Sequence, residues 1–203
     1  MIVHEFTLGE LQSNCYILEN SGECLIVDPA DEGDFIAEQI QRHKLKPLAI
    51  VATHGHFDHI LAVGELQASF AIPAYLQKED FSLARQAHAS ATHFLEVPPV
   101  YLEPKWTSLL SINKELKHFG LEIILTPGHT PGGCCFYNKS EGILFSGDTL
   151  FKDGIGSYDH SYSDKKLLNE SLQKLFTLPD TTIVYPGHGE EAILVTIPAF
   201  QAP

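Results

Sequence analysis

Short runs of apolar residues, separated by polar turns, recur along this chain and predict alternating strands and helices. The chain opens with a strand meander, in which the turn-forming residues Asn20-Ser21-Gly22 join the second and third strands. Later apolar runs of strand length are bounded by proline, glycine or polar residues. We expect strands at residues 3–8, 14–18, 24–27, 48–52, 121–125, 142–146 and 181–185.

Helical periodicity is found between these strands. One helix begins between Asp31 and Asp34 and ends in the basic stretch 42–44, so both ends suit the helix dipole. We expect further helices at 60–70, 79–91 and 164–176, the last capped by Ser163 or Asp164. Strands that alternate with helices predict an α/β fold, and the lack of a linker predicts one domain over residues 1–203.

The segment from about residue 77 to 119 is the hardest to interpret. Three prolines between residues 97 and 106 exclude regular structure there. A long irregular segment in a compact domain serves either as a lid or binding loop, or as a surface excursion whose aromatic side chains pack down. The sequence leaves both interpretations open.

Charge and cysteine content narrow the possible partners. The chain has 13 Lys and Arg against 26 Asp and Glu, a formal net charge of −13, whereas nucleic-acid binding depends on basic residues. We therefore expect no nucleic-acid partner. No apolar run is long enough to span a membrane, and the N-terminal residues do not resemble a signal peptide. The cysteines have no disulfide-framework spacing, so we expect buried thiols in a cytoplasmic protein. They are Cys15, Cys24, Cys134 and Cys135.

Four of the predicted strands lead into short glycine-containing turns that present histidine or aspartate. Loops at the carboxyl ends of strands are where α/β proteins build their sites. We therefore expect these four turns to form one site. The turns are Thr53-His54-Gly55-His56-Phe57-Asp58-His59, Pro127-Gly128-His129, Ser146-Gly147-Asp148 and Pro186-Gly187-His188.

Imidazoles and carboxylates together form the ligand set of zinc, manganese or non-haem iron. In an extended segment the side chains of His54, His56 and Asp58 project to the same side, whereas that of His59 projects to the other side. Seven candidates are too many for one ion and suit two divalent ions that share a carboxylate, for which Asp148 is the natural bridge. The candidates are His54, His56, Asp58, His59, His129, Asp148 and His188. We expect the other histidines to lie on the surface or behind the ligands, and His160 is the only one of them that we consider a further candidate near the site.

These residues resemble the H-x-H-x-D-H hallmark of the metallo-β-lactamase superfamily, and the similarity runs from Asn14-Cys15-Tyr16 to Pro186-Gly187-His188-Gly189. Residues 126–132 and 146–151 are similar to the glyoxalase II-like, or hydroxyacylglutathione hydrolase-like, branch. The resemblance implies a four-layer αβ/βα sandwich with a dimetal site along one edge. It also implies that one ion takes His54, His56 and His129, the other takes Asp58, His59 and His188, and Asp148 bridges them. We expect zinc, with iron or manganese as alternatives.

The chain departs from the glyoxalase II pattern in two places. Glyoxalase II proper has a C-terminal helical domain, whereas this sequence stops soon after His188. Ser157 stands where the family usually has a Lys or Arg that binds glutathione, and Lys152 compensates only if the loop folds differently. We expect the fold and the metal to carry over, but not glutathione recognition. The best-known zinc β-lactamases usually have cysteine in place of Asp148, which argues against antibiotic hydrolysis.

The expected activity is hydrolysis of a small-molecule thioester or ester of the hydroxyacylglutathione type. A hydroxide bridging the two ions attacks the carbonyl. Asp58 and Asp148 are the candidate catalytic carboxylates, and Asp58 is also a candidate to orient the hydroxide. Three residues beside the ligands either fix imidazole tautomers or cap turns: Asp28, Thr53 and Thr130. Four aromatic residues either wall the cleft or pack: Tyr101, Trp106, Tyr158 and Tyr162.

Other functions remain open on the same residues. An Fe(II) persulfide dioxygenase-like enzyme would use His129, Asp148 and one histidine of the first motif, and ligand counting does not separate it from a hydrolase. A hydrolase of another ester or of a lactone fits equally. A nuclease is disfavoured by the net charge of −13. A non-catalytic binding module would have lost ligands, and none is missing.

Overall fold

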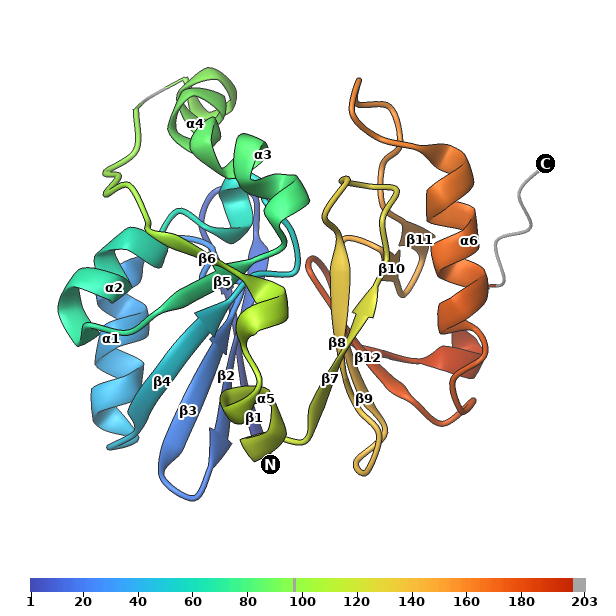
Figure 1. The fold of residues 1–203 in the computed structure, drawn as a ribbon, viewed down its shortest axis with the longest axis horizontal. Helices are drawn as coiled ribbons and strands as arrows, with labels where there is room; N and C mark the ends of the chain where they lie inside the picture. The colour runs from blue at the N-terminus through green and yellow to red at the C-terminus, as the bar shows by residue number, and fades with distance from the viewer. Residues whose placement is uncertain (97, 199–203) are drawn as a thin grey trace.

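Two β-sheets pack face to face, and helices cover the outer side of each (Figure 1). The computed structural model describes residues 1–96 and 98–198. The first sheet has the strand order β1-β2-β3-β4-β5-β6, and the second has the order β13-β12-β9-β8-β7. The layers are therefore helix, sheet, sheet and helix, which is the expected four-layer α/β sandwich.

The N-terminal half forms the first sheet and its helices. Its first three strands pair antiparallel, and β3 to β6 pair parallel. The strands are β1 Ile2–Leu8, β2 Ser13–Asn20, β3 Glu23–Val27, β4 Lys46–Val51, β5 Ala74–Leu76 and β6 Trp106–Ser108. The helices are α1 Gly33–Arg42, α2 Val63–Phe70, α3 Phe81–Arg85 and α4 Ala87–Leu95.

The C-terminal half forms the second sheet, in which β9 and β12 are parallel and the other neighbours are antiparallel. The sheet strands are β7 Leu121–Leu125, β8 Cys134–Asn138, β9 Ile143–Gly147, β12 Ile183–Pro186 and β13 Ala192–Ile193. A separate ribbon is made of β10 Leu150–Phe151 and β11 Gly154–Ile155. The helices are α5 Lys114–His118 and α6 Lys165–Leu175.

Three apolar cores fill the three spaces between the four layers. Strand β2 contributes to two of these cores. Its residues Cys15 and Ile17 face the core under α1 and α2, while Tyr16 and Leu18 face the second sheet. This alternation is the period of two that a strand buried on both faces requires. The third core lies between the second sheet and α6, where Leu168, Leu172 and Leu175 are buried.

Most expected elements are observed with small shifts of their ends. The helix expected at 164–176 is α6, and the Asp164 side chain caps it by accepting the backbone N–H of Leu167 at 3.0 Å. The helix expected at 60–70 begins only at Val63, because residues 57–59 form a turn of 3-10 helix first. Strands β5, β6, β8, β10, β11 and β13 were not expected; all of them except β8 have only two or three residues.

The helix expected at 79–91 is wrong as one element. Residues 78–80 form a 3-10 turn, and two helices, α3 and α4, meet at Gln86, whose backbone N–H bonds the carbonyl of Leu83. The two helices lie over different partners: α3 packs on the loop at Gly55, and α4 packs on the 3-10 turn at residues 57–59. Packing overrides the propensity for one continuous helix.

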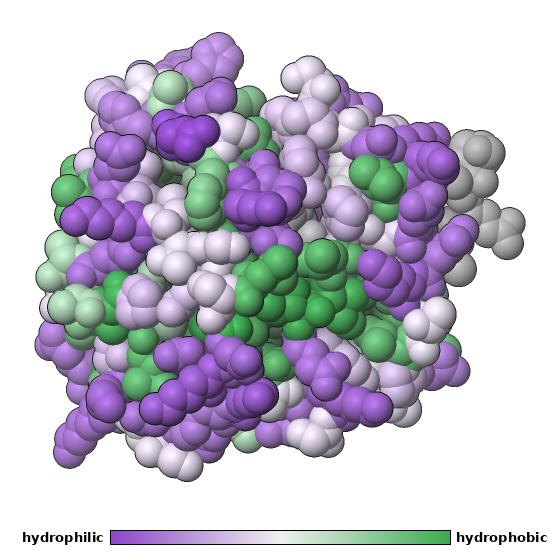
Figure 2. Space-filling view, in the orientation of Figure 1, coloured by the Kyte–Doolittle hydropathy of each residue, from purple (hydrophilic) through white to green (hydrophobic). Residues whose placement is uncertain are grey.

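The proline-containing segment packs as a surface excursion. Residues 98–105 have no regular structure, Trp106 begins β6, and Val97 lies outside the described residues. Tyr101 and Trp106 pack against the first core, and Tyr101 stacks on His88 with ring centroids 5.4 Å apart. Figure 2 shows apolar surface between the turn that follows β6 and the end of β7. Leu110 and Leu125, one in each of these places, are exposed.

All four cysteines are buried, and none of them forms a disulfide within the described residues. Burial raises the pKa of the Cys135 thiol to about 11, so it stays protonated near neutral pH. None of the described helices combines the length and the apolar character that a membrane crossing needs.

Candidate metal centre

Four strands deliver the candidate ligands to one edge of the two sheets. Strand β4 leads into His54, β7 into the turn that holds His129, β9 into Asp148 and β12 into His188. Because β9 and β12 are parallel neighbours, their carboxyl ends lie side by side. A bridge between Ser13 and His188 joins the two sheets at this edge. The structure thus brings together side chains that are far apart in the sequence.

The first loop changes conformation within the motif. His56 is extended, with φ −70° and ψ 144°, and the 3-10 turn of residues 57–59 follows at once. As a result, His54 and His56 join one cluster of possible ligand atoms, while Asp58 and His59 join another.

The first group contains three imidazoles. Nδ1 of His56 lies 3.1 Å from Nε2 of His54 and 3.0 Å from Nε2 of His129. Burial, reinforced by the His129 imidazole, lowers the pKa of His56 to about 3, although Asp58 opposes the shift. Burial likewise lowers the pKa of His54 and of His129. All three rings are therefore neutral at physiological pH and keep a lone pair on one nitrogen.

The outer nitrogen of each of these rings is held by a neighbouring oxygen. In the order His54, His56 and His129, the partners are the Thr53 hydroxyl at 3.0 Å, the Tyr162 hydroxyl at 2.8 Å and the Ser157 carbonyl at 2.7 Å. The Thr53 hydroxyl donates its own proton to Asp28, so it must accept the proton of His54. Protons on the outer nitrogens leave the inner nitrogens free to bind a cation.

The second group combines two imidazoles with a carboxylate. Nε2 of His188 lies 3.3 Å from Nε2 of His59 and 3.2 Å from Oδ2 of Asp58. Burial alone would lower the pKa of His59, but the carboxylates around it, chiefly Asp148, outweigh burial and raise that pKa to about 10. Burial works against ionisation of Asp58 too, yet His59 and His188 hold its pKa below the usual range.

Oxygen atoms also support the second group from outside. Nδ1 of His59 lies 3.3 Å from Oδ2 of Asp28, and Nδ1 of His188 lies 3.3 Å from the carbonyl of Gln12. The Ser13 hydroxyl donates to Oδ2 of Asp58 at 2.9 Å. Asp28 therefore serves both groups, since it also accepts the Thr53 hydroxyl.

Asp148 lies between the two groups. Its Oδ2 is 3.6 Å from Nε2 of His129 and 3.6 Å from Nε2 of His188, and its Oδ1 is 3.4 Å from Nε2 of His59. Oδ1 is buried and has no hydrogen-bond partner among the described residues. Gly187, the residue before His188, allows this approach, because a Cβ at that position would lie 2.2 Å from Oδ1 of Asp148.

The donor set fits two cations. A zinc ion with Zn–N bonds of about 2.0–2.1 Å and tetrahedral angles places its nitrogen ligands about 3.3 Å apart. The inner nitrogens of the first group lie 3.0 and 3.1 Å apart, and the tautomers inferred above turn their lone pairs toward one another, while those of His59 and His188 lie 3.3 Å apart. Facing lone pairs and an orphaned carboxylate oxygen are unfavourable unless a positive charge lies between them. The cluster is therefore suited to a dinuclear metal centre.

A buried carboxylate that the sequence did not reveal braces the first group. Asp80 is fully buried and accepts the backbone N–H of Gly55 at 2.9 Å, the hydroxyl of Thr130 at 2.7 Å and the N–H of Gly132 at 2.6 Å. Gly55 separates two of the candidate ligands, and Thr130 follows the third. Burial raises the pKa of Asp80, and these hydrogen bonds oppose the shift.

The residues expected beside the ligands divide by role. Thr53 and Asp28 do contact ligand imidazoles, whereas Thr130 contacts Asp80 instead. Tyr162, expected either to wall the cleft or to pack, lines the pocket beside the centre and also holds His56. Ser13 and Asp80 gave no sequence signal, because neither lies near a ligand in the chain.

The loop after Asp148 places three residues that the sequence analysis singled out. Lys152, the candidate to compensate for the absent basic residue, pairs with Glu190 at 2.6 Å. Ser157 contributes its backbone carbonyl to His129. His160 does lie at the centre, stacked on Tyr162 and with its ring centroid 5.4 Å from that of His56.

Comparison with known proteins agrees with this geometry. The family model described as the metallo-beta-lactamase superfamily matches residues 8–188. This chain belongs to the metallo-beta-lactamase superfamily. As a member that contains the whole histidine and aspartate cluster, it is a metal-dependent hydrolase.

Two relatives in the superfamily span nearly the whole chain. The probable metallo-hydrolase YqgX of Bacillus subtilis is 38% identical over 192 residues, which cover 93% of this chain and 90% of that protein. Hydroxyacylglutathione hydrolase GloC of Haemophilus influenzae is 29% identical over 182 residues, which cover 88% of this chain and 86% of that protein. The second likeness supports the glyoxalase II-like branch that the motifs indicated.

Two solved structures of the superfamily are similar throughout. TTHA1623 in a di-iron-bound form is 36% identical, with a TM-score of 0.86 and 96% of each chain covered. BLEG-1, a B3 metallo-beta-lactamase, is 34% identical, with a TM-score of 0.85 and coverage of 96% of this chain and 95% of that one. The metallo-beta-lactamase fold expected from the sequence is confirmed.

Proposed function

We propose that this protein hydrolyses small-molecule thioesters of the hydroxyacylglutathione type with two divalent ions, zinc in the first instance. His54, His56 and His129 would hold one ion, Asp58, His59 and His188 the other, and Asp148 both. One observation carries the proposal: every candidate imidazole has its outer nitrogen beside an oxygen and its inner nitrogen aimed at the same small volume around Asp148.

When bound, such ions lower the pKa of water to roughly 7 and polarise a carbonyl. The protein contributes neutral imidazoles, which leave most of the positive charge of the first ion uncompensated. It also contributes Asp58, whose contacts with Ser13, His59 and His188 all fall on Oδ2. Oδ1 of Asp58 would then be the atom that orients the attacking water.

A thioester suits this site because its leaving group needs little help. Hydrolysis forms a C–O bond from water and breaks the C–S bond, with the electron pair leaving on sulfur. The products at neutral pH are a carboxylate, a thiol and one released proton. A thiol has a pKa of about 8.5, so a thiolate departs without a strong general acid.

The remaining partners follow from the same considerations. We propose a small-molecule substrate and no nucleic acid, since the net charge of −13 opposes a polyanion. We also propose a cytoplasmic location, because four buried thiols suit a reducing compartment. These proposals are tested by fractionation and by a binding assay with labelled RNA and DNA.

Iron is the second candidate for the metal, because TTHA1623 is similar over 96% of this chain and was solved with two iron ions. Iron keeps the persulfide dioxygenase-like alternative in view. The two functions differ in an observable way, since a dioxygenase consumes oxygen and a hydrolase does not.

The deciding experiment combines metal analysis with a substrate panel. We expect two ions per chain and hydrolysis of S-lactoylglutathione or a simpler thioester, with no oxygen uptake on glutathione persulfide. Esters, lactones and a β-lactam belong in the panel, the last because BLEG-1 is a B3 metallo-beta-lactamase. His56→Ala should abolish hydrolysis in a folded protein. Full activity of the chelated, metal-free protein would overturn the proposal.

A further inference from the structure

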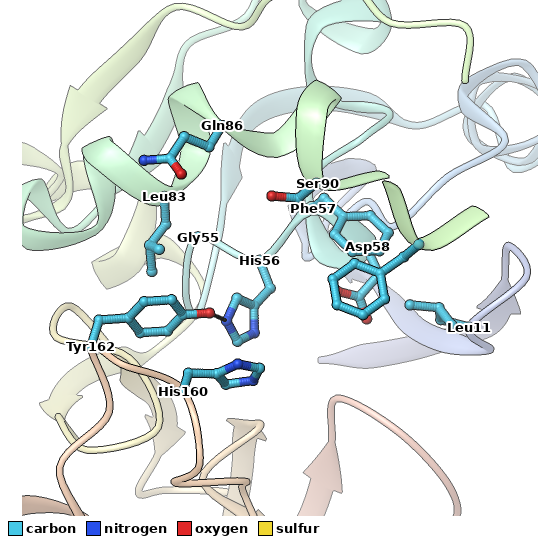
Figure 3. A pocket seen from close by; sticks show the side chains of 11 residues that line it. Leu11, Gly55, His56, Phe57, Asp58, Leu83, Gln86, Ser90, His160 and Tyr162 are labelled. Carbon is cyan, nitrogen blue, oxygen red and sulfur yellow. Dashed lines mark hydrogen bonds between the residues drawn. The ribbon is translucent and has the colours of Figure 1, made fainter. Parts of the chain in front are cut away.

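A pocket of about 210 Å³ opens beside the candidate ligands His56 and Asp58 (Figure 3). Leu83 of α3, Gln86 at the junction of the two helices and Ser90 of α4 line it on one side. Figure 3 shows these side chains across the pocket from the imidazole rings. The pocket therefore adjoins ligands of both groups and is placed to hold one part of a substrate during attack.

The pocket carries no positive side chain. Among the described residues that line it there is no Lys or Arg, and the single carboxylate is Asp58 itself. Gln86 and Ser90 are polar but uncharged. The two carboxylates of a glutathione moiety would lose their hydration here without gaining a cation in exchange.

Apolar side chains at the mouth of this pocket are exposed to water. Leu11 is 44% exposed and Phe94 is 64% exposed, and the Phe94 ring stacks on Phe57 with centroids 5.7 Å apart. Leu83 adds apolar surface from α3. Exposed apolar side chains that gather around a concave site are typical of a surface that a ligand covers.

A second opening borders His188 and differs from the pocket in its charged side chains. Phe151, Lys152, Asp153 and Glu190 line it, and Lys152 pairs with Glu190 at 2.6 Å. Charged and polar groups stabilise the negative charge that develops on a departing sulfur better than apolar side chains do. The leaving group therefore suits the opening at His188, and the acyl group suits the pocket beside His56. Two carboxylates against one ammonium at this opening give the carboxylates of a glutathione leaving group little net attraction.

We infer that the pocket lined by Leu11, Leu83 and Phe94 binds the acyl part of the substrate and selects an uncharged, apolar acyl group. This inference rests on the proposed thioester hydrolysis. It predicts that acyl chain length governs catalytic efficiency, while a glutathione moiety adds little. Each methylene that the pocket buries should raise kcat/KM about four-fold, which corresponds to about 0.8 kcal/mol.

The test uses the metal-loaded protein and acetyl, butyryl and hexanoyl thioesters of N-acetylcysteamine, a neutral thiol. Lactoyl thioesters of N-acetylcysteamine and of glutathione form a matched pair. Binding of acetate, butyrate and hexanoate is measured by calorimetry in parallel. Phe94→Ala and Leu11→Ala remove pocket surface. Leu110→Ala is the control, since Leu110 is 62% exposed and does not line the pocket.

We expect kcat/KM and carboxylate affinity to rise with chain length. Phe94→Ala and Leu11→Ala should at least halve the gain per methylene, and Leu110→Ala should not change it. Thioester hydrolysis without a chain-length effect, or with more than ten-fold preference for the glutathione thioester, would overturn the inference alone. Chain-length-dependent binding, lost in Phe94→Ala, without hydrolysis of any thioester would overturn the proposed function and leave the acyl pocket standing. If no thioester were hydrolysed and carboxylate binding did not depend on chain length, both the proposed function and the acyl pocket would be overturned.

Discussion

The two groups of the metal centre are built on different principles. The first group consists of three neutral imidazoles held by hydroxyl and carbonyl oxygens, with the buried carboxylate of Asp80 behind them. The second includes a carboxylate, Asp58, and has a second carboxylate, Asp28, at its outer side. The first group thus depends on a rigid scaffold, and the second depends on charge.

Exposure varies within each group. The side chains of His54 and His59 are 2% and 0% exposed, whereas that of His188 is 30% exposed and His56 lines the pocket. An ion in either group would therefore be partly shielded from water, and the low dielectric would strengthen its action on a carbonyl. Metal binding by each group can be weakened separately, by a variant that removes a scaffold contact of the first group or a contact of the charged Asp58 in the second.

We expect the largest loss of metal binding from substitution of Asp148, because this residue contacts imidazoles of both groups. Among the described residues, Asp148 is the one carboxylate within 4 Å of imidazoles of both groups, and Asp148→Ala removes it. Loss of a residue behind a ligand already costs about 10–100-fold in affinity, so loss of a shared ligand should cost more than about 100-fold. We expect at most one ion by elemental analysis and no measurable hydrolysis.

Asp148→Asn serves as the companion variant, because it keeps the shape of the side chain and removes its charge. Circular dichroism should show both variants folded. Two tightly bound ions in folded Asp148→Ala would contradict a shared role.

Asp80→Ala should have the next largest effect and should weaken metal binding by the first group. It removes the hydrogen-bond acceptor of the N–H groups of Gly55 and Gly132 and of the Thr130 hydroxyl, and each buried donor left without a partner costs about 1–3 kcal/mol of stability. We expect a loss of about 10–100-fold in affinity for the first ion, with the second retained. Stepwise titration of the metal-free protein with zinc against a chromophoric chelator measures both steps.

Urea unfolding of the same variant separates stability from metal binding. Asp180→Ala, at an exposed aspartate, is the matched control and should bind two ions like the parent protein. Equal weakening of both binding steps in Asp80→Ala would show that the brace is not confined to the first group.

Much of the fold was predictable because the longer strands and helices leave apolar runs and periodic patterns in the sequence. Strand β7 is observed with the expected bounds, and α6 begins at one of its two expected caps. Elements of two or three residues, such as β5 and β13, were not predictable. They exist because longer neighbours offer them hydrogen bonds, and a window of two or three residues has no period of its own.

The candidate ligands were predictable, whereas most of their supports were not. Each ligand follows a strand within a glycine-containing turn, which is a local signal. The interaction of Tyr162 with His56 spans 106 residues and that of Ser13 with Asp58 spans 45, so no local pattern records them. Thr53 and Asp28 were candidates only because they adjoin ligands or strand ends in the chain.

Ser13→Ala should weaken the second group more modestly. Ser13 is buried, and its hydroxyl donates to the charged Asp58 at 2.9 Å. A hydrogen bond to a charged group is worth about 1.5–3 kcal/mol, of which the ion itself compensates a part, so we expect roughly a ten-fold loss in affinity for the second ion. The same zinc titration measures it.

Ser69→Ala is the control for Ser13→Ala, because Ser69 is an exposed serine on α2. It should leave both binding steps unchanged. A loss confined to the first step in Ser13→Ala would reverse the comparison between the two groups.

The smallest effect is expected at Tyr162, because its bond to His56 joins two neutral groups and the side chain is only half-buried. Such a bond is worth about 0.5–1.5 kcal/mol, so Tyr162→Phe should lower affinity for the first ion by about two- to ten-fold and leave the second unchanged. Tyr158→Phe, at a more exposed tyrosine nearby, is the matched control. If Tyr162→Phe cost as much as Asp80→Ala, the first group would depend on this one hydroxyl rather than on the buried scaffold, because a neutral hydrogen bond cannot otherwise account for such a loss.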